Sequence, residues 1–312
     1  MAHQVETMAY SGEVPWHGLG TKVIDDLTPE QMMEKAGIDW TVKKRPLTYS
    51  SSKHKVFEVP GKQALIRETD GKLLDVVGTD WNPVQNAEAM GFFHDFVMEG
   101  DMKMDTAGSL REGQMVWALA KVDNDFTLFD GDKVESYLLF SNPHQYGKSI
   151  DIRFTPIRVV CNNTLTMSLS GSAASGVKVG HRKEFDASLV KQTLGLAEQR
   201  MDEYKNIANT LGEKQYSEDK VKEYFGHILG TSKVTDDKLS RTARRAFEIL
   251  ETQPGAEYRK GSWWNALNAV TYITDHELGR NSDNRVSSAW FGGNRTRKLK
   301  AVEKAVEYAH SA

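Results

Sequence analysis

The chain has 312 residues, of which 39% are apolar and 27% are charged, and its formal net charge at pH 7 is −3. This composition is typical of a globular protein and excludes a disordered, collagen-like or low-complexity chain. Cys161 is the only cysteine and no apolar run reaches about 18 residues, which excludes a disulfide framework, a cysteine-rich zinc site and a membrane-spanning helix.

The first half of the chain is predicted to be mostly strands. A short helix comes first, because Thr28 suits the N-cap, Pro29 suits the first helical position and Gly37 suits the end. A second helix opens at Pro83 and ends at Gly100, since its apolar residues recur at helical spacing. The predicted strands, separated by turn signals, are Trp40–Tyr49, Lys55–Val59, Ala64–Glu68, Leu73–Val77, Met102–Ser109, Gln114–Val122, Val134–Phe140 and Ile150–Phe154.

The second half is predicted to be mostly helical. Thr155-Pro156 repeats the cap-and-proline pattern, so we expect a helix from there to about Leu169, followed by a small, polar loop. Further candidate helices are 186–211, 217–229, 239–252, 262–276 and 296–310. The sequence therefore predicts an α+β domain over residues 1–183 and an all-helical domain over residues 184–312.

Charge is distributed unevenly between the two halves. Residues 1–150 hold 15 Lys+Arg and 23 Asp+Glu, whereas residues 151–312 hold 25 Lys+Arg and 20 Asp+Glu. This pattern fits two lobes of different composition, or a basic surface in the second half that meets a polyanion. The basic clusters there are Lys178 with His181-Arg182-Lys183, Arg241 with Arg244-Arg245, and Arg295–Lys300.

Four ordered motifs resemble a family named phage/plasmid-like protein, which carries a domain of unknown function. Thr155–Leu165 resembles the family's R-V-V-C-x-N-T-L signature, and Trp16–Gly20 resembles its W-H-G-L-G motif. Val77–Asn86 resembles V-G-x-x-Y-x-P-V-Q-N with Trp81 at the tyrosine position, and the segment Asn265–His276 resembles N-A-V…D-H. The loop 142–149 departs from the N-S-H-D-G-S of the family, so no role is carried over to it. The resemblance implies a protein of mobile genetic elements.

The order of elements resembles a second group, the single-strand annealing proteins of phage recombination. The resemblance rests on the order of elements along the chain: strands come first, then a helix with a P-V-Q-N-like start, then further strands and a basic turn. It implies a twisted antiparallel sheet with crossing helices in the N-terminal domain. It also implies protomers that assemble into rings or filaments.

The segment after Pro156 is the main candidate for binding nucleic acid. In a helix, Arg158 and Asn162 share one face, and the free N–H groups at its start, with Arg153 and Lys148 nearby, would suit phosphate. Alternatively, the two asparagines at 162 and 163 only tie the helix to neighbouring backbone. The predicted nucleic-acid contacts are Lys148, Arg153, Arg158, Asn162, Asn163, Lys178, Arg182 and Lys183.

Other side chains have a functional and a structural interpretation. Trp16 and His17 precede Gly18 and Gly20, which allow close approach of the backbone, so they would stack on a base or, as we favour, anchor an N-terminal arm. Cys161 lies among apolar residues, so we favour a structural thiol over a nucleophile. The Asp275-His276 pair lacks the spacing of a metal site, and no phosphate-binding loop or dinucleotide motif occurs, so we expect neither metal nor cofactor.

The C-terminal aromatic residues divide into two groups. Trp263 and Trp264 belong to a helical stripe and are predicted to be core residues. Trp290-Phe291-Gly292 fits a loop that binds nucleic acid or, equally, a turn between helices.

Together these patterns predict a phage or plasmid protein that binds nucleic acid without enzymatic turnover. It would oligomerise, hold single-stranded DNA in a basic groove and promote annealing in the cytoplasm of a bacterial host, since Met1–Glu6 lacks the features of a secretory signal. The alternative is a phage factor that binds or sequesters a host protein or a small nucleotide, for example against host defence. A third option is an enzyme, which requires that His17, Cys161 and Asp275-His276 converge in one cleft.

Overall fold

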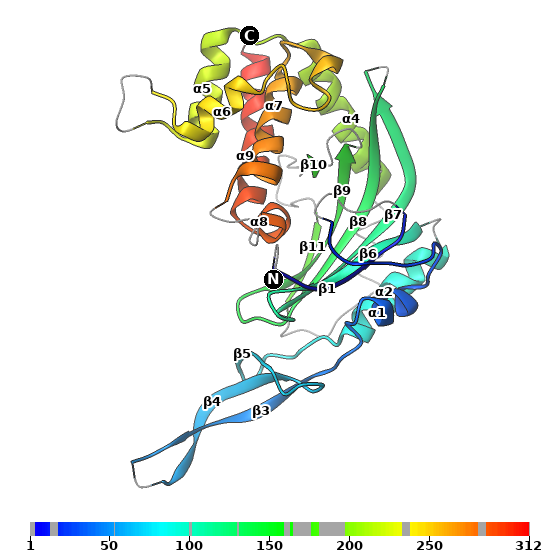
Figure 1. The fold of residues 1–312 in the computed structure, drawn as a ribbon, viewed down its shortest axis with the longest axis vertical. Coiled ribbons are helices and arrows are strands. Elements are labelled where there is room, and N and C mark those ends of the chain that lie inside the picture. The colour runs from blue at the N-terminus through cyan, green and yellow to red at the C-terminus, as the bar shows by residue number, and fades with distance from the viewer. Residues whose placement is uncertain are drawn as a thin grey trace.

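The computed structural model describes residues 4–12, 18–52, 54–99, 102–129, 131–158, 163–164, 176–180, 197–232, 238–279 and 285–311. A twisted sheet lies at the centre, with helices gathered at one end and a second, smaller sheet at the other (Figure 1). The α+β prediction is therefore confirmed, with strands in the N-terminal half and helices in the C-terminal part. No helix in these ranges is long and apolar enough to cross a membrane.

The central sheet has the strand order β10-β9-β8-β7-β6-β1-β2, and β11 also pairs with β9. Neighbouring strands are antiparallel except β1 and β2, which are parallel. The strands are β1 (Val5–Tyr10), β2 (Thr21–Lys22), β6 (Met102–Leu110), β7 (Met115–Leu128), β8 (Asp132–Pro143), β9 (Ser149–Arg158), β10 (Asn163–Thr164) and β11 (Gly176–Gly180).

Two helices, α1 (Pro29–Lys35) and α2 (Asn86–Glu99), pack against one face of the central sheet. The predicted start of α1 is confirmed, because the Thr28 hydroxyl accepts a hydrogen bond from the Gln31 N–H while the Gln31 side chain accepts one from the Thr28 N–H. Gly37 follows the helix with a φ of 65°, a left-handed conformation that favours glycine.

The smaller sheet has the order β3-β4-β5, formed by β3 (Val42–Ser50), β4 (Val56–Arg67) and β5 (Leu73–Gly78). The sequence predicted two strands here, Lys55–Val59 and Ala64–Glu68, separated by a turn at Pro60-Gly61. This prediction was wrong, because the single strand β4 runs through both segments. The pairs Pro46↔Gln63 and Thr48↔Glu58 enclose one residue of β3 and four of β4, so the extra residues form an irregularity within a continuous hairpin. The β3–β4 hairpin projects away from the rest of the molecule (Figure 1). Its segment Lys43–Lys62 is called the arm below.

The C-terminal helices enclose a second core. They are α4 (Ala197–Glu213), α5 (Glu218–Leu229), α6 (Arg241–Glu248), the 3-10 helix η2 (Ala256–Arg259), α7 (Trp263–Tyr272), the π-helical turn η3 (Ile273–Glu277), α8 (Arg285–Phe291) and α9 (Gly293–His310). Trp263 and Trp264 are buried in this core, which confirms their predicted role. Leu128 and Val134, from the far ends of β7 and β8, also belong to it.

The prediction of a helix that begins at Thr155-Pro156 was wrong for the residues that the structure describes, 155–158 and 163–164. Residues Thr155 to Arg158 continue β9 and pair with β8, with Pro156 opposite Ser136, and the short strand β10 pairs with the end of β9. Long-range pairing has therefore overridden the local cap-and-proline pattern. On its other edge, β9 pairs with β10 and β11, but no described residue of these two strands pairs with Pro156. A proline has no N–H to donate, so a strand tolerates it at a position where no partner requires that N–H.

Asp105 of β6 predicts a pH dependence of stability. Burial, together with the negative charge of Glu135, raises the pKa of Asp105 to about 7 against the opposing charge of Lys121. Between about pH 4 and 7 the folded chain keeps a proton that the unfolded chain has lost, so stability falls as the pH rises through this range. The loss amounts to a few kcal/mol at most, since one pKa unit is about 1.4 kcal/mol.

Urea unfolding of the parent and of Asp105→Asn at pH 5 and pH 8 measures this contribution. The variant is expected to lose less stability than the parent between the two pH values, because it has no carboxyl to ionise. Equal losses in the two proteins would show that Asp105 is not the source.

Candidate functional site

A cationic pocket of about 280 Å³ lies where β8 and β9, with the loop between them, face helices α8 and α9. Four cationic side chains line it against one carboxylate: Arg111, Lys148, Arg153 and Arg295 against Asp151. The remaining lining residues are Met115, Ser141, Pro143, Gly147, Ser149 and Phe291. The pocket therefore carries an excess of positive charge and suits an anion.

Arg153 forms the floor of the pocket and is only 4% exposed. One guanidinium nitrogen, Nη2, donates a hydrogen bond of 2.8 Å to the carbonyl oxygen of Trp290, and Nη1 lies 3.2 Å from Asp151 Oδ2. The guanidinium also lies 5.6 Å from the ring centroid of Phe291. Burial and the neighbouring Arg295 lower the pKa of Arg153 to about 10 despite Asp151, so the side chain is still protonated at neutral pH.

Helix α9 adds two more cations on the same side. Burial lowers the pKa of Arg295, and the Asp151 carboxylate opposes this shift. One turn further along, Lys298 is fully buried and donates a 2.7 Å hydrogen bond to Asp275. Burial also lowers the pKa of Lys298, and the charges of Arg153 and Arg295 lower it further. Arg153, Arg295 and Lys298 therefore lie close to only two carboxylates, those of Asp151 and Asp275. Arg111 and Lys148 add two further positive charges to the pocket.

Two buried nitrogens of this cluster form no hydrogen bond with a described atom: Arg295 Nε, and Arg153 Nη1, which lies within ion-pair distance of Asp151 without hydrogen-bond geometry. A buried donor without an acceptor is costly, and a bound oxyanion would supply acceptors to both. Guanidinium groups match phosphate oxygens particularly well, because their N–H donors form a planar fork. The arrangement is therefore best suited to a phosphate group.

The structure brings together two of the predicted contact residues, Lys148 and Arg153, and places them in this pocket. Arg153 is buried, so it does not lie in the open groove that we expected. Backbone pairing places Arg158 opposite Asn163 and Lys178 opposite Asp151. Six of the singled-out residues lie outside the described residues: Trp16, His17, Cys161, Asn162, Arg182 and Lys183.

Sequence reasoning missed part of the cationic cluster. Arg295 and Lys298 belong to the basic run 295–300 that the sequence displays, but no local pattern shows that they meet β9. Arg111 belongs to the turn between β6 and β7, where its φ is 53°, and it also lines the pocket while its Nε donates a hydrogen bond to Gln4. Only the folded chain shows that these cations converge.

The Asp275-His276 pair, considered above for a metal or enzymatic site, has a structural explanation. Asp275 is the buried partner of Lys298, and the ring of His276 packs 4.8 Å from that of Tyr272. Within the described ranges, no group of three or more His, Cys, Asp or Glu side chains could hold a metal ion. Trp290 and Phe291 are the last residues of α8, and Gly292 alone separates them from α9, so the predicted turn between helices is at Gly292.

The P-V-Q-N motif also has a structural explanation. Gln85 bonds to both backbone groups of Val42, accepting from its N–H at 2.9 Å and donating to its carbonyl oxygen at 3.0 Å. The buried Asn86 side chain donates to the carbonyl oxygen of Ile38, and its Oδ1 lies 3.0 Å from His144 Nε2. The motif therefore ties the segments before and within β3 to the end of β8.

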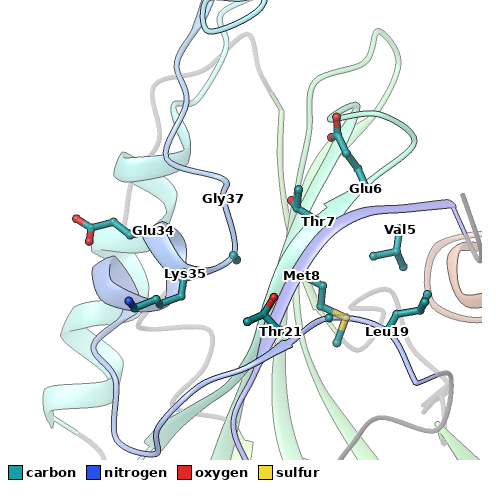
Figure 2. A pocket seen from close by; sticks show the side chains of 11 residues that line it. Val5, Glu6, Thr7, Met8, Leu19, Thr21, Glu34, Lys35 and Gly37 are labelled. Atoms are coloured by element: carbon teal, nitrogen blue, oxygen red, sulfur yellow. The ribbon is translucent and has the colours of Figure 1, made fainter.

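A second hollow, of about 610 Å³, lies beside β1 and β2, next to the end of α1 (Figure 2). Its charged lining side chains are Glu6, Glu34 and Lys35, so it lacks the cation excess of the first pocket. Gly20, from the W-H-G-L-G motif, also lines it with a φ of 103°. A Cβ at this position would lie 3.1 Å from side-chain atoms of Met8 and Tyr10, so the motif needs glycine there.

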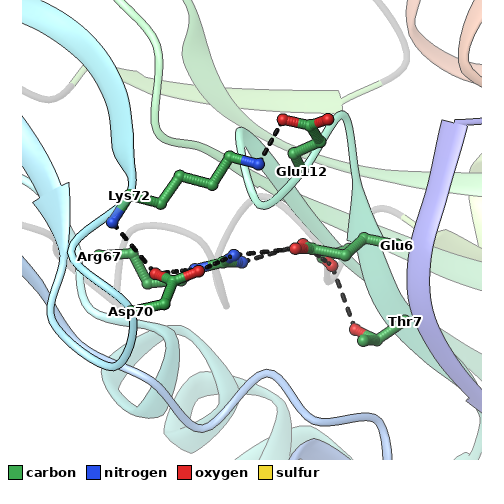
Figure 3. A network of polar contacts seen from close by, with 7 residues as sticks. Glu6, Thr7, Arg67, Asp70, Lys72 and Glu112 are labelled. Carbon is green, nitrogen blue, oxygen red and sulfur yellow. Dashed lines mark hydrogen bonds and ion pairs between the residues drawn. The ribbon is translucent and has the colours of Figure 1, made fainter.

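Glu6 on the rim of this hollow joins the two sheets through Arg67 (Figure 3). The buried Arg67 guanidinium donates two hydrogen bonds to Glu6, of 3.0 and 2.9 Å, and two to Asp70, of 3.0 and 2.7 Å. It also lies 5.3 Å from the ring centroid of Trp40. Because Arg67 ends β4 and Glu6 lies in β1, this network holds the base of the hairpin against the central sheet.

Comparison with known proteins identifies one family. A family model described as "Domain of unknown function (DUF932)" matches residues 73–301, which include every residue that lines the cationic pocket. No curated protein and no solved structure matches the chain.

Proposed function

The chain belongs to the DUF932 family, and we propose that it is a nucleic-acid-binding protein of a phage or plasmid that promotes annealing of single-stranded DNA during recombination. The observation that carries this proposal is the cationic pocket. Four cationic side chains line it against the single carboxylate of Asp151, and two buried arginine nitrogens, Arg153 Nη1 and Arg295 Nε, form no hydrogen bond with a described group. The phage or plasmid origin rests on the four sequence motifs.

The pocket would contribute to annealing by binding the sugar–phosphate backbone. Arg153 and Arg295 would hold one phosphate, and Lys148 and Arg111 would attract its neighbours from the rim. Contacts of this kind carry no sequence information, so the bases remain available to pair with a complementary strand. We further propose that several protomers assemble as a ring or filament along the strand, in the cytoplasm of the bacterial host.

The dimensions of the pocket favour a second candidate function. A volume of about 280 Å³ with a buried floor suits the phosphate group of a small nucleotide as well as a backbone phosphate. In that case the protein would sequester a nucleotide, for example to blunt host defence. The two functions differ in one measurable property, because only strand binding depends on the length of the nucleic acid.

Salt-titrated binding of labelled single strands tests the proposal. We expect affinity to rise with strand length and to fall steeply with salt, since each phosphate contact on a single strand contributes about 0.7 to the slope of log K against log salt. Lys148→Ala should weaken binding several-fold and reduce that slope by about one contact. Arg295→Met should weaken binding more, because it removes a buried donor.

Lys103→Ala is the matched control, since Lys103 is exposed and its ion pair with Asp26, also exposed, involves no residue that lines the pocket. Its binding should equal that of the parent. No detectable binding at low salt and micromolar protein contradicts the proposal. Binding of mononucleotides as tight as that of long strands favours sequestration instead.

A further inference from the structure

The arm is the most basic exposed element of the N-terminal half. Residues 43–62 hold six lysines and arginines and a single glutamate, although residues 1–150 as a whole are acidic. Lys43 and Arg45 pair with Glu68 at the base of the arm, whereas Lys55 and Lys62 are exposed. The overall acidity of this half therefore conceals a projecting basic hairpin (Figure 1).

The arm also exposes aromatic rings. Tyr49 and Phe57 lie directly opposite each other across the hairpin, with their centroids 5.5 Å apart, and they are 56% and 44% exposed. Large apolar side chains on a projecting hairpin have no core to pack against, so an exposed pair of this kind marks an interaction surface. Basic side chains interleaved with exposed aromatic rings are the combination that binds single-stranded nucleic acid.

A contact at the base of the arm connects it to the cationic pocket. Lys62 lies 5.5 Å above the ring of Tyr146, which belongs to the loop between β8 and β9 and is itself about half exposed. The backbone N–H of Tyr146 donates a 2.6 Å hydrogen bond to Asp75, so this loop is fixed to β5. The residues that follow, Gly147 and Lys148, line the pocket. Aromatic and basic groups thus continue from the arm to the phosphate site.

We infer that the arm and Tyr146 form a docking surface on which a single strand of nucleic acid lies as it leads into the cationic pocket. The inference rests on the proposed function and adds the surface that the strand contacts. Bases would stack on Tyr49, Phe57 and Tyr146, while Lys55 and Lys62 bind phosphates. A second copy of the chain is the competing occupant, but the like charge of two arms opposes their pairing.

The test compares single-strand binding by the parent, by the double variant Tyr49→Ala/Phe57→Ala and by the control Ile24→Ala. Ile24 is a matched control because it is an apolar side chain that is 76% exposed away from the arm. The double variant should bind a long single strand about tenfold more weakly or worse, as expected from the loss of base stacking. It should keep the parent's melting temperature and its binding of inorganic phosphate. Tyr49→Trp/Phe57→Trp should retain strand binding, because indole rings also stack.

The outcomes separate the inference from the proposed function. If the parent and the alanine double variant bind the strand equally well, the arm inference is wrong while the proposed function stands. If the parent binds no strand at all, the proposed function and the inference built on it both fail. If the double variant keeps its strand affinity but forms smaller particles in light scattering, the arm binds a second copy and the inference is overturned.

Discussion

Lys298→Met is expected to lower the free energy of unfolding by about 3–5 kcal/mol. The Lys298 ammonium and the Asp275 carboxylate are 0% and 4% exposed and lie 2.7 Å apart. Removal of the cation leaves a negative charge in a low-dielectric interior without its main partner. Because the arginines of the pocket also lie near this pair, the variant should bind phosphate more weakly as well.

Urea unfolding followed by circular dichroism measures the effect on stability. Lys300→Met is the control, since Lys300 lies two residues further along α9 and is exposed, and its stability should stay within about 0.5 kcal/mol of the parent. The double variant Asp275→Leu/Lys298→Met should recover most of the loss, because it removes both charges together. A loss below about 1 kcal/mol for Lys298→Met would mean that water reaches the pair.

Arg67→Met is expected to cost about 2–4 kcal/mol, the second largest effect. The variant loses four charge-assisted hydrogen bonds and leaves the partly buried Glu6 without its cation. The same interactions raise the pKa of Arg67 and lower that of Asp70 to about 2. Arg67→Lys should recover little, since an ammonium cannot bond to two carboxylates with two donors each.

Unfolding in urea and limited proteolysis together test this prediction. Besides the loss of stability, we expect faster cleavage near the base of the arm, because Arg67 joins the hairpin to β1. Lys103→Met serves as the control, since it breaks an exposed pair of which little stability is expected. Unchanged proteolysis in Arg67→Met would show that other contacts hold the hairpin in place.

The local signals in the sequence were reliable where the structure depends on local chemistry. The capping box of α1, the apolar stripe with Trp263 and Trp264, and the α+β class follow from propensity and periodicity, and all are confirmed. The same signals misled at Pro60-Gly61 and at Pro156. At Pro60-Gly61 the hairpin continues on both sides of an irregularity, and at Pro156 the strand pairs with β8; in both cases the partner strand lies outside the local window.

The candidate site was predicted only in part for a similar reason. Lys148 and Arg153 are close in sequence, so a strand and its preceding loop were enough to associate them. Arg111 and Arg295 reach the same pocket from a distant turn and a distant helix, and no spacing in the sequence indicates this meeting. The arm was missed because charges were counted over residues 1–150 as a whole, where the acidic residues outnumber the basic ones.

The C-terminal helices touch the central sheet at two separate places. Leu128 and Val134 enter the helical core at one end, and at the other the rings of Trp290 and Trp117 meet edge to face with centroids 5.0 Å apart. The helical core and the apolar cluster around Trp117 therefore each contain residues from both halves of the chain. Consequently we expect neither half to fold alone. A fragment cut near residue 183 should expose apolar surface at both contacts and aggregate, whereas the intact chain should melt in a single cooperative transition.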